Sequence, residues 1–177
     1  DSSKDDDEKI ETLYKKFENN NSELSHFNLT SSVNSFSEWL LSKDLVYVGG
    51  GNTSFMLEIW RNNNFEQLFK TAYDKGIILS GVSAGAVCWF DWILSDSMGL
   101  GFKPLKGINL IEGSCTPHSS NIERINEFKL NIKNNKLPNG IAIDDGVAVV
   151  FIDGKPTEVY STICLLYTSP SPRDTIR

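Results

Sequence analysis

Residues 78–90 read ILSGVSAGAVCWF. An apolar run typical of a buried strand is interrupted between Gly81 and Gly85, and apolar residues then resume with helix-like spacing. Because glycine has no Cβ, two glycines around one serine allow a strand and a helix to approach closely through a sharp turn. The pattern predicts a strained backbone at Ser83, an exposed hydroxyl, and a following helix that runs to about residue 92.

The segments on either side of this turn alternate between helical and strand patterns, which predicts an α/β domain with a mainly parallel sheet and helices on both faces. Continuous apolar runs indicate buried strands at 45–48 and 77–80. Further strands are expected at 25–29, within 108–121 and within 140–161, where Asp153-Gly154 predicts a hairpin turn. Residues 95–107 have the composition of a loop. Helices are expected over 8–20, 35–44 (capped by Ser35 or Ser37), 53–64, 65–76 and 122–135.

Composition is that of a single globular domain: the chain has 177 residues, of which 40% are hydrophobic and 23% charged. We expect one domain over residues 1–164 and a non-native or disordered tail over 165–177, whose prolines and serines interrupt regular structure. The net charge of −6 argues against nucleic acid and anionic membranes as partners. No segment has the length of a membrane span and no signal peptide is evident, so we expect a cytoplasmic protein.

The G-x-S-x-G spacing at 81–85 is that of a nucleophile elbow. In this interpretation Ser83 is a catalytic nucleophile, and helix amides beginning near Ala84 point toward charge that develops on a substrate carbonyl. A second cluster, Gly49-Gly50-Gly51-Asn52, also follows a buried strand. It lacks the lysine of a phosphate-binding P-loop, and beside a serine elbow it can supply the second amide of an oxyanion hole.

A serine nucleophile needs a general base, and the chain has only two histidines, His26 and His118. His118 lies in a loop after an expected strand, which makes it the better candidate. A carboxylate should orient the imidazole, and the sequence by itself does not choose among four candidates: Asp91, Asp96, Glu112 and Glu123.

Three scattered cysteines, Cys88, Cys115 and Cys164, have no C-x-x-C spacing, so neither a zinc site nor a disulfide framework is expected. By residue type, Cys88 and Cys115 are alternative candidates for the nucleophile, but Cys88 is better explained as a small buried packing residue. We expect no metal and no organic cofactor.

Four motifs in this order, VYVGGGNT (46–53), ILSGVSAGAVCWF, CTPH (115–118) and IAIDDGVAVVF (141–151), resemble the S51 serine peptidases. That family contains the aspartyl dipeptidase (peptidase E) and cyanophycinase groups, and the likeness is to its bacterial peptidase E-like branch. The resemblance covers residues 8 to 163. It implies a fold like that of the class I glutamine amidotransferases, a flavodoxin-like three-layer sandwich, with serine in place of their elbow cysteine.

The resemblance also assigns roles to residues. It implies that Ser83 is the nucleophile, His118 the catalytic histidine and Asp96 the acidic residue. The oxyanion hole and substrate-binding positions are Gly50, Gly51, Asn52 and Ala84, with the amides of Gly51 and Ala84 holding the oxyanion.

Relative to the family pattern, a first strand is expected before Asp1 and further strands beyond Ser161, so the chain looks truncated at both ends. The arginine that precedes the acidic residue in aspartyl dipeptidases is absent from DWILSD (91–96), so a preference for Asp-X dipeptides is not supported.

The function expected from these features is a serine exopeptidase or dipeptidase that cleaves short peptides through an acyl-enzyme, as a monomer or homodimer. The alternative is an inactive domain of the same fold that binds a peptide or metabolite. Amidotransferase-like amide hydrolysis normally uses a cysteine at the position of Ser83, so it is the weakest of the three hypotheses.

Overall fold

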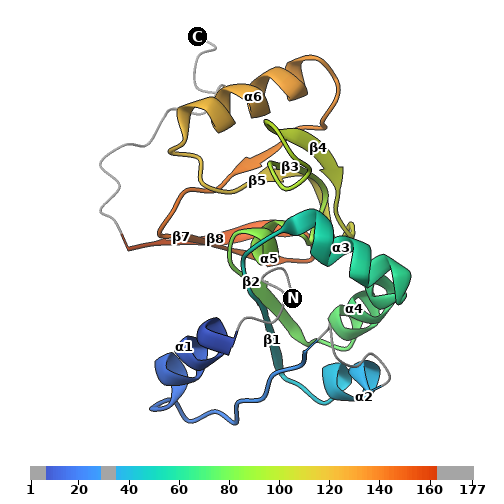
Figure 1. Cartoon of the computed structure of the whole chain (residues 1–177), viewed down its shortest axis with the longest axis vertical. Coiled ribbons are helices and arrows are strands. Elements are labelled where there is room, and N and C mark those ends of the chain that lie inside the picture. The colour runs from blue at the N-terminus through green and yellow to red at the C-terminus, as the bar shows by residue number, and fades with distance from the viewer. Residues whose placement is uncertain (1–6, 29–34, 163–177) are drawn as a thin grey trace.

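The protein is described by a computed structural model, which places residues 7–28 and 35–162. It is a mixed α/β structure in which helices and strands alternate along most of the chain (Figure 1). The expected tail at 165–177 lies outside the described residues. In chain order the elements are α1 (Asp7–Phe17), α2 (Phe36–Leu41), β1 (Leu45–Val48), α3 (Thr53–Asn62), α4 (Phe65–Asp74), β2 (Ile78–Gly81), α5 (Ala84–Val87), β3 (Phe90–Ser95), β4 (Lys103–Lys106), β5 (Ile111–Thr116), α6 (Ile122–Lys133), β6 (Gly140–Ala142), β7 (Val147–Ile152) and β8 (Lys155–Ser161).

Strands β1 and β2 form a parallel pair with Val46 beside Leu79 and Val48 beside Gly81. The side chains of β1 alternate between buried and exposed, and Val46 and Val48 join the main hydrophobic core. Helices α3 and α4 contribute Trp60 and Phe69 to this core, and their rings pack in a tilted arrangement with 4.4 Å between centroids. Burial of this apolar surface fixes the two strands against the two helices.

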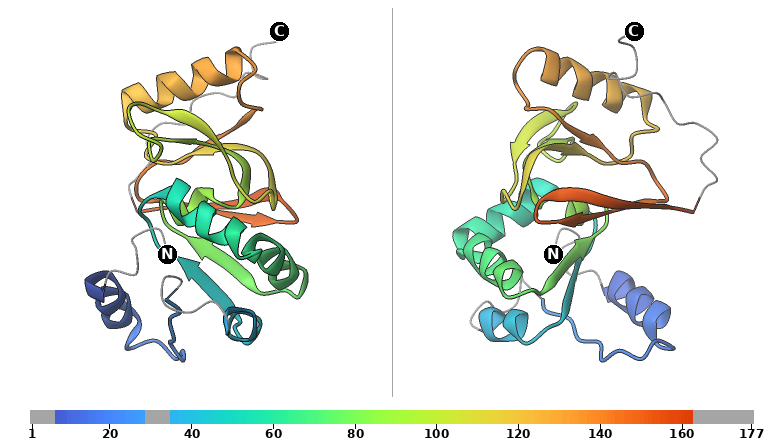
Figure 2. Two further views of the ribbon diagram at one scale, coloured as in Figure 1. Left: turned by 45° about the vertical axis from the view of Figure 1, so that its right-hand side comes forward. Right: turned by 180° about the vertical axis from the view of Figure 1, so that it is seen from behind.

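A second sheet contains four strands in the order β4-β3-β5-β6. Strand β5 runs parallel to both β3 and β6, whereas β4 is antiparallel to β3. Helix α6 packs on this sheet, and Phe128 from α6 shares a smaller core with Leu94 and Leu137. Figure 2 shows α6 at the opposite end of the molecule from α1 and α2.

Strands β7 and β8 form an antiparallel hairpin. Its turn is Asp153-Gly154, where both residues have positive φ angles of 51° and 72°. This is the geometry that the Asp-Gly pair predicts, because two consecutive residues with positive φ match the twist of the flanking strands.

Two segments differ from the sequence prediction. The helix after Ser83 ends at Val87 rather than near residue 92, because 90–95 is strand β3, held between β4 and β5. Part of the expected loop 95–107 is strand β4, which pairs with β3 through Ile93 and Leu105. An apolar run this short is compatible with a helix or a strand, and the neighbouring strands decide it. The described part of the expected strand at 25–29 has no strand structure.

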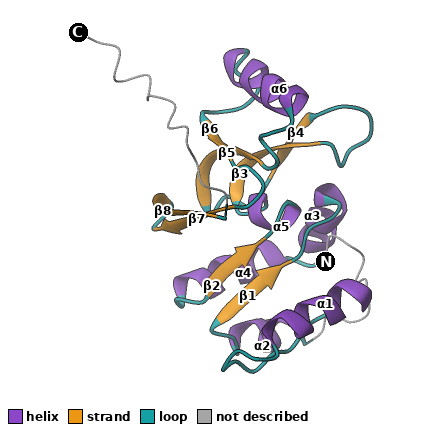
Figure 3. Cartoon of the chain, turned by 90° about the vertical axis from the view of Figure 1, so that its left-hand side faces the viewer, coloured by secondary structure: helices purple, strands orange, loops and turns teal. Residues whose placement is uncertain are grey.

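The junction of β1, β2 and α5 depends on two glycines that allow very close backbone packing. A Cβ on Gly85 would overlap the carbonyl oxygen of Val48, and a Cβ on Gly81 would lie 2.7 Å from the same oxygen. Figure 3 shows the two strands leading toward the short helix α5. Only glycine at these two positions allows the turn to sit directly against β1.

Within residues 7–28 and 35–162, none of the helices combines the length and the apolar character that a membrane span requires.

We expect Gly85→Ala to destabilise the fold by about 3 kcal/mol, because the added methyl meets rigid backbone rather than a mobile side chain. Urea unfolding measures the loss. Gly76→Ala is the matched control: the φ of Gly76 is +82° but its Cβ would meet open space, so only the conformational cost of about 1 kcal/mol should remain. Equal losses in the two variants would contradict the steric explanation.

Candidate active site

Ser83 occupies the turn between β2 and α5 with φ 52° and ψ −115°. This combination is rare for a residue with a side chain and is maintained only where the surrounding structure enforces it. The turn is held by the amide of Val82 donating to Val48 O at 3.1 Å and the amide of Gly85 donating to Val82 O at 2.9 Å. The Ser83 hydroxyl is consequently raised out of the sheet, as the sequence predicts.

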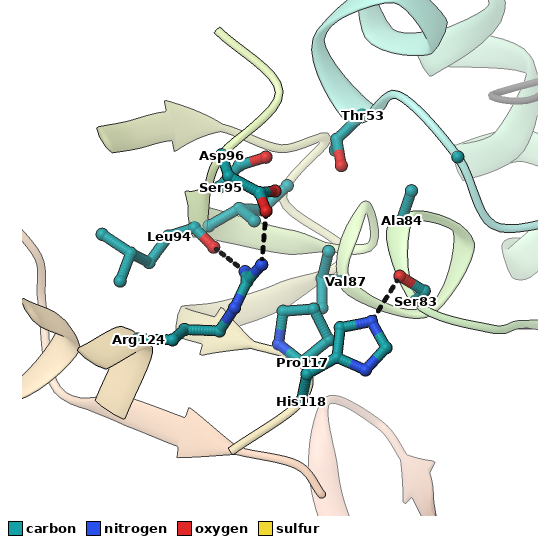
Figure 4. Close-up of a pocket in the computed structure, with 12 residues that line it drawn as sticks. Thr53, Ser83, Ala84, Val87, Leu94, Ser95, Asp96, Pro117, His118 and Arg124 are labelled. Carbon is teal, nitrogen blue, oxygen red and sulfur yellow. Dashed lines mark hydrogen bonds and ion pairs between the residues drawn. The ribbon is translucent and has the colours of Figure 1, made fainter. Parts of the chain in front are cut away.

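His118 faces this hydroxyl. Its Nε2 atom lies 2.9 Å from Ser83 Oγ (Figure 4). The two residues are 35 positions apart in the sequence, and each follows the carboxyl end of a parallel strand, β2 for Ser83 and β5 for His118. His118 also has a positive φ of 55°, so its ring position depends on an unusual backbone conformation in the loop after Pro117.

The other ring nitrogen of His118 contacts Asp145. Asp145 Oδ1 lies 2.5 Å from His118 Nδ1. Asp145 follows β6, the neighbour of β5 in the sheet, so the two side chains meet above adjacent strand ends. Ser83, His118 and Asp145 therefore form a hydroxyl–imidazole–carboxylate chain.

Gly51 and Ala84 line the same pocket as Ser83 and His118. Within the described part of the chain, the structure assigns no acceptor to the amide of either residue. Gly51, in the loop between β1 and α3, has a φ of 150°, and Ala84 is the first residue of α5. Their placement fits the predicted pair of oxyanion donors.

Gly50 and Asn52, the other two predicted binding positions, have structural contacts. A Cβ on Gly50 would lie 3.3 Å from the Ser83 Cβ, so this glycine lets the loop after β1 pack against the elbow. The Asn52 Oδ1 caps α3 by accepting the amide of Phe55 at 2.9 Å, and the Asn52 Nδ2 donates to Ser97 O at 3.4 Å. Among the described residues that line the pocket, neither Gly50 nor Asn52 is present.

Asp96, the acidic residue that the resemblance favours, lines the pocket but does not contact His118 in the structure. Its Oδ2 accepts from Arg124 Nη2 at 2.8 Å (Figure 4). The Arg124 side chain is only 7% exposed, whereas that of Asp96 is 61% exposed. Arg124 also points Nη1 at Leu94 O, 3.4 Å away, and its guanidinium lies 4.6 Å from the Phe102 ring centre. A buried guanidinium needs such partners, which explains why Asp96 is engaged here.

The remaining candidates lie away from the imidazole. Asp91 forms an ion pair with Lys106 at 3.0 Å, and the side chains of Glu112 and Glu123 are exposed. His26 is hydrogen-bonded to the Tyr14 hydroxyl at 3.0 Å, near the N-terminal helix.

Cys88 and Cys115 are unsuited to nucleophilic attack, since both thiols are fully buried. Burial raises the pKa of each thiol well above its ordinary value because the thiolate would be desolvated. They are packing residues, as the sequence indicates for Cys88. In the described part of the chain, the structure brings together no group of three or more histidine, cysteine, aspartate or glutamate side chains suited to a metal.

The pocket has a volume of about 260 Å³ and contains both the Ser83–His118 pair and the Asp96–Arg124 pair. The sequence model of Peptidase family S51 matches residues 1–159 of the chain. The chain belongs to peptidase family S51. Membership supports the predicted function of a peptidase, a hydrolase of peptide bonds.

Two proteins of similar sequence are peptidases by name, from Bacillus subtilis and Listeria monocytogenes. The chain is 32% identical over 155 residues to the uncharacterized peptidase YgaJ of Bacillus subtilis (strain 168), covering 86% of this chain and 67% of that protein. It is 28% identical over 98 residues to the uncharacterized peptidase Lmo0363 of Listeria monocytogenes serovar 1/2a (strain ATCC BAA-679 / EGD-e), covering 52% of this chain and 48% of that protein.

The fold matches the crystal structure of a "Putative Peptidase E Protein" from Listeria monocytogenes EGD-e with a TM-score of 0.64 and 23% identity. The alignment covers 86% of this chain and 76% of that one. The fold class predicted from the sequence, α/β of the class I glutamine amidotransferase-like type, is confirmed.

Sequence reasoning missed two residues of the site, Asp145 and Arg124. Asp145 lies within the motif IAIDDGVAVVF, and its place after a short strand was a signal that it could reach the same sheet edge as His118. Arg124 carried no comparable signal, because an arginine in the first turn of an amphipathic helix is usually solvated.

We expect neither Cys88 nor Cys115 to react with a disulfide reagent such as DTNB while the protein is folded, even at pH 9, because burial disfavours both thiolates. The measurement uses a Cys164→Ser variant, so that only these two thiols remain. Both should react after denaturation in guanidinium chloride. Rapid labelling of the folded variant would show that a cysteine is accessible to the pocket.

Proposed function

We propose that this S51 protein is a serine-type peptidase in which Ser83 is the nucleophile, His118 the general base and Asp145 the carboxylate that orients the imidazole. The observation that carries the proposal is the contact of both His118 ring nitrogens, with Ser83 Oγ at 2.9 Å and with Asp145 Oδ1 at 2.5 Å. A neutral imidazole with its proton on Nδ1 donates to Asp145 and leaves Nε2 free to accept the serine proton.

The reaction proceeds in two halves. Ser83 Oγ attacks the carbonyl carbon of the scissile bond while its proton passes to His118 Nε2, and the amides of Gly51 and Ala84 stabilise the oxyanion. His118 then gives this proton to the departing amine, the C–N bond breaks and an ester to Ser83 remains. A water molecule, deprotonated by His118, attacks the ester, and the proton returns to Ser83 as the acid product leaves.

Replacement of Ser83 by alanine should lower kcat by about 10⁴-fold or more, because the nucleophile is removed and no acyl-enzyme can form. The wild-type protein should also gain one covalent adduct from a serine-directed fluorophosphonate, detected by intact mass, and Ser83→Ala should gain none. Ser42→Ala, at the end of α2, is the control and should retain activity and labelling. A folded wild-type protein that forms no adduct but binds peptides would instead favour the inactive binding domain.

We further propose that the substrates are short peptides with a free amino terminus. The pocket of about 260 Å³ is below the roughly 300–1000 Å³ of typical ligand sites, which favours a substrate of few residues. Asp96 supplies a carboxylate in this pocket whose side chain is 61% exposed, although one of its oxygens already pairs with Arg124. An exposed carboxylate beside the nucleophile suits the α-ammonium group of a bound peptide.

Dipeptides with a free amino terminus should therefore be cleaved faster than their N-acetylated forms. In Asp96→Asn we expect KM for free dipeptides to rise about tenfold with little change in kcat, since binding of the ammonium group is weakened equally in the ground and transition states. The asparagine oxygen can still accept from Arg124. Asp91→Asn, which removes a carboxylate paired with Lys106 outside the pocket, is the matched control. Equal cleavage of free and acetylated peptides by the wild type would contradict this assignment.

A further inference from the structure

The loops that carry His118 and Asp145 are joined beyond the ends of their strands. Where β5 and β6 end, the amide of Ile143 donates to Thr116 O at 3.0 Å and the amide of Ser119 donates to Ile143 O at 3.2 Å. The following hydrogen bond between the two loops involves a side chain, since the amide of Ser120 donates to Asp144 Oδ1 at 2.9 Å. The carboxylate of Asp144 thus continues the hydrogen bonding between the β5 and β6 segments beyond the ends of the strands.

Asp144 Oδ1 accepts a second amide, that of Asp145, at 2.8 Å. One oxygen therefore connects the loop after β5 to the backbone of the residue that contacts His118. These amide hydrogen bonds, the one from Asp145 foremost, lower the pKa of Asp144 below its ordinary value. The carboxylate is anionic at neutral pH, in the form that accepts both bonds.

The two side chains that this link brings together have little packing to hold them. The His118 side chain is 42% exposed and that of Asp145 is 66% exposed. A core residue is held by its neighbours, but these two groups depend on where their loops run. Asp145 also lies between β6 and β7, directly before Gly146, whose φ is 73°, so no strand pairing holds its backbone.

We propose that Asp144 is the positioning residue of the triad: its carboxylate joins the amides of Ser120 and Asp145 and thereby holds the Asp145 side chain against His118. The inference rests on the proposed function, because it names a residue that acts on the Ser83–His118 chemistry through Asp145. Nothing in this role requires Asp144 to touch the substrate, and Asp144 is absent from the described residues that line the pocket.

Two substitutions of Asp144 separate the effect of its two hydrogen bonds from the effect of its negative charge. Asp144→Ala removes both bonds and should lower kcat about 10²-fold with KM changed by no more than about twofold, because small displacements of a catalytic group cost about that much and substrate binding is untouched. Asp144→Asn keeps an oxygen at the same place and should restore most of the lost kcat. Asp74→Ala, at the exposed end of α4, is the control for loss of a surface carboxylate.

A spectroscopic measurement tests the same inference without any peptide hydrolysis. A proton held between an imidazole Nδ1 and a carboxylate at 2.5 Å gives a proton NMR resonance at unusually low field. With only two histidines in the chain, a His26→Gln background leaves His118 as its source. We expect the resonance in this background, its loss in Asp144→Ala and its retention in Asp144→Asn.

Three outcomes would overturn the inference. The first is an unchanged low-field resonance in Asp144→Ala, and the second is an Asp144→Ala protein in which KM rises but kcat is unchanged. The third is an Asp144→Asn protein whose kcat is as low as that of Asp145→Ala. The last comparison does not require Asp144→Ala to fold. If the wild type cleaves no peptide and labels at no serine, the proposed function fails, while the resonance still decides whether Asp144 holds Asp145 against His118.

Discussion

The site depends on the close backbone approach of α5 to β1. Gly81 and Gly85 let the turn after β2 lie directly against the carbonyl of Val48, where any Cβ would collide. In that space the chain can reverse only by placing Ser83 at a positive φ, with its hydroxyl raised from the sheet. The close contact of α5 with β1 also places the amide of Ala84, the first of α5, and the loop after β1 on two sides of the pocket that contains Ser83. Core packing of α3 and α4 provides the rigidity that keeps this strained turn in place.

The groups of the proposed active site lie at the carboxyl ends of several strands, as is general for parallel α/β sheets. The loop after β1 contributes Gly51, the turn after β2 contributes Ser83, and the loops after β5 and β6 contribute His118 and Asp145. Within each sheet, neighbouring parallel strands bring their carboxyl ends to one edge, and loops from both the β1–β2 pair and the sheet that contains β5 and β6 line the same pocket. The Asp96–Arg124 pair lies on another side of the same pocket, so the carboxylate proposed to bind the substrate ammonium group and the proposed catalytic pair Ser83–His118 share a space of about 260 Å³.

Much of this site could be predicted from short motifs. The glycine spacing around Ser83, the glycine loop at 49–51 and the small number of histidines were sufficient to propose Ser83, His118, an amide near Ala84 and an amide of the glycine loop as one group. The resemblance to the S51 family then implied that the loop amide is that of Gly51. The carboxylate was different. Asp96 and Asp145 are both acidic residues that follow strands, and nothing local distinguishes them. The structure separates them through their partners, because a buried arginine faces Asp96 and the His118 ring faces Asp145.

The amino-acid sequence by itself determined the elements whose cause is local: amphipathic helices, apolar strands, the Asp-Gly hairpin and the glycine-flanked serine turn. Tertiary structure decided what depends on neighbours distant in the chain. Residues 90–95 are strand rather than helix because β4 and β5 offer hydrogen-bond partners on both sides, and Asp145 meets His118 because β5 and β6 are adjacent. Local propensity acts over a few residues, whereas strand order brings together groups 27 or 35 positions apart.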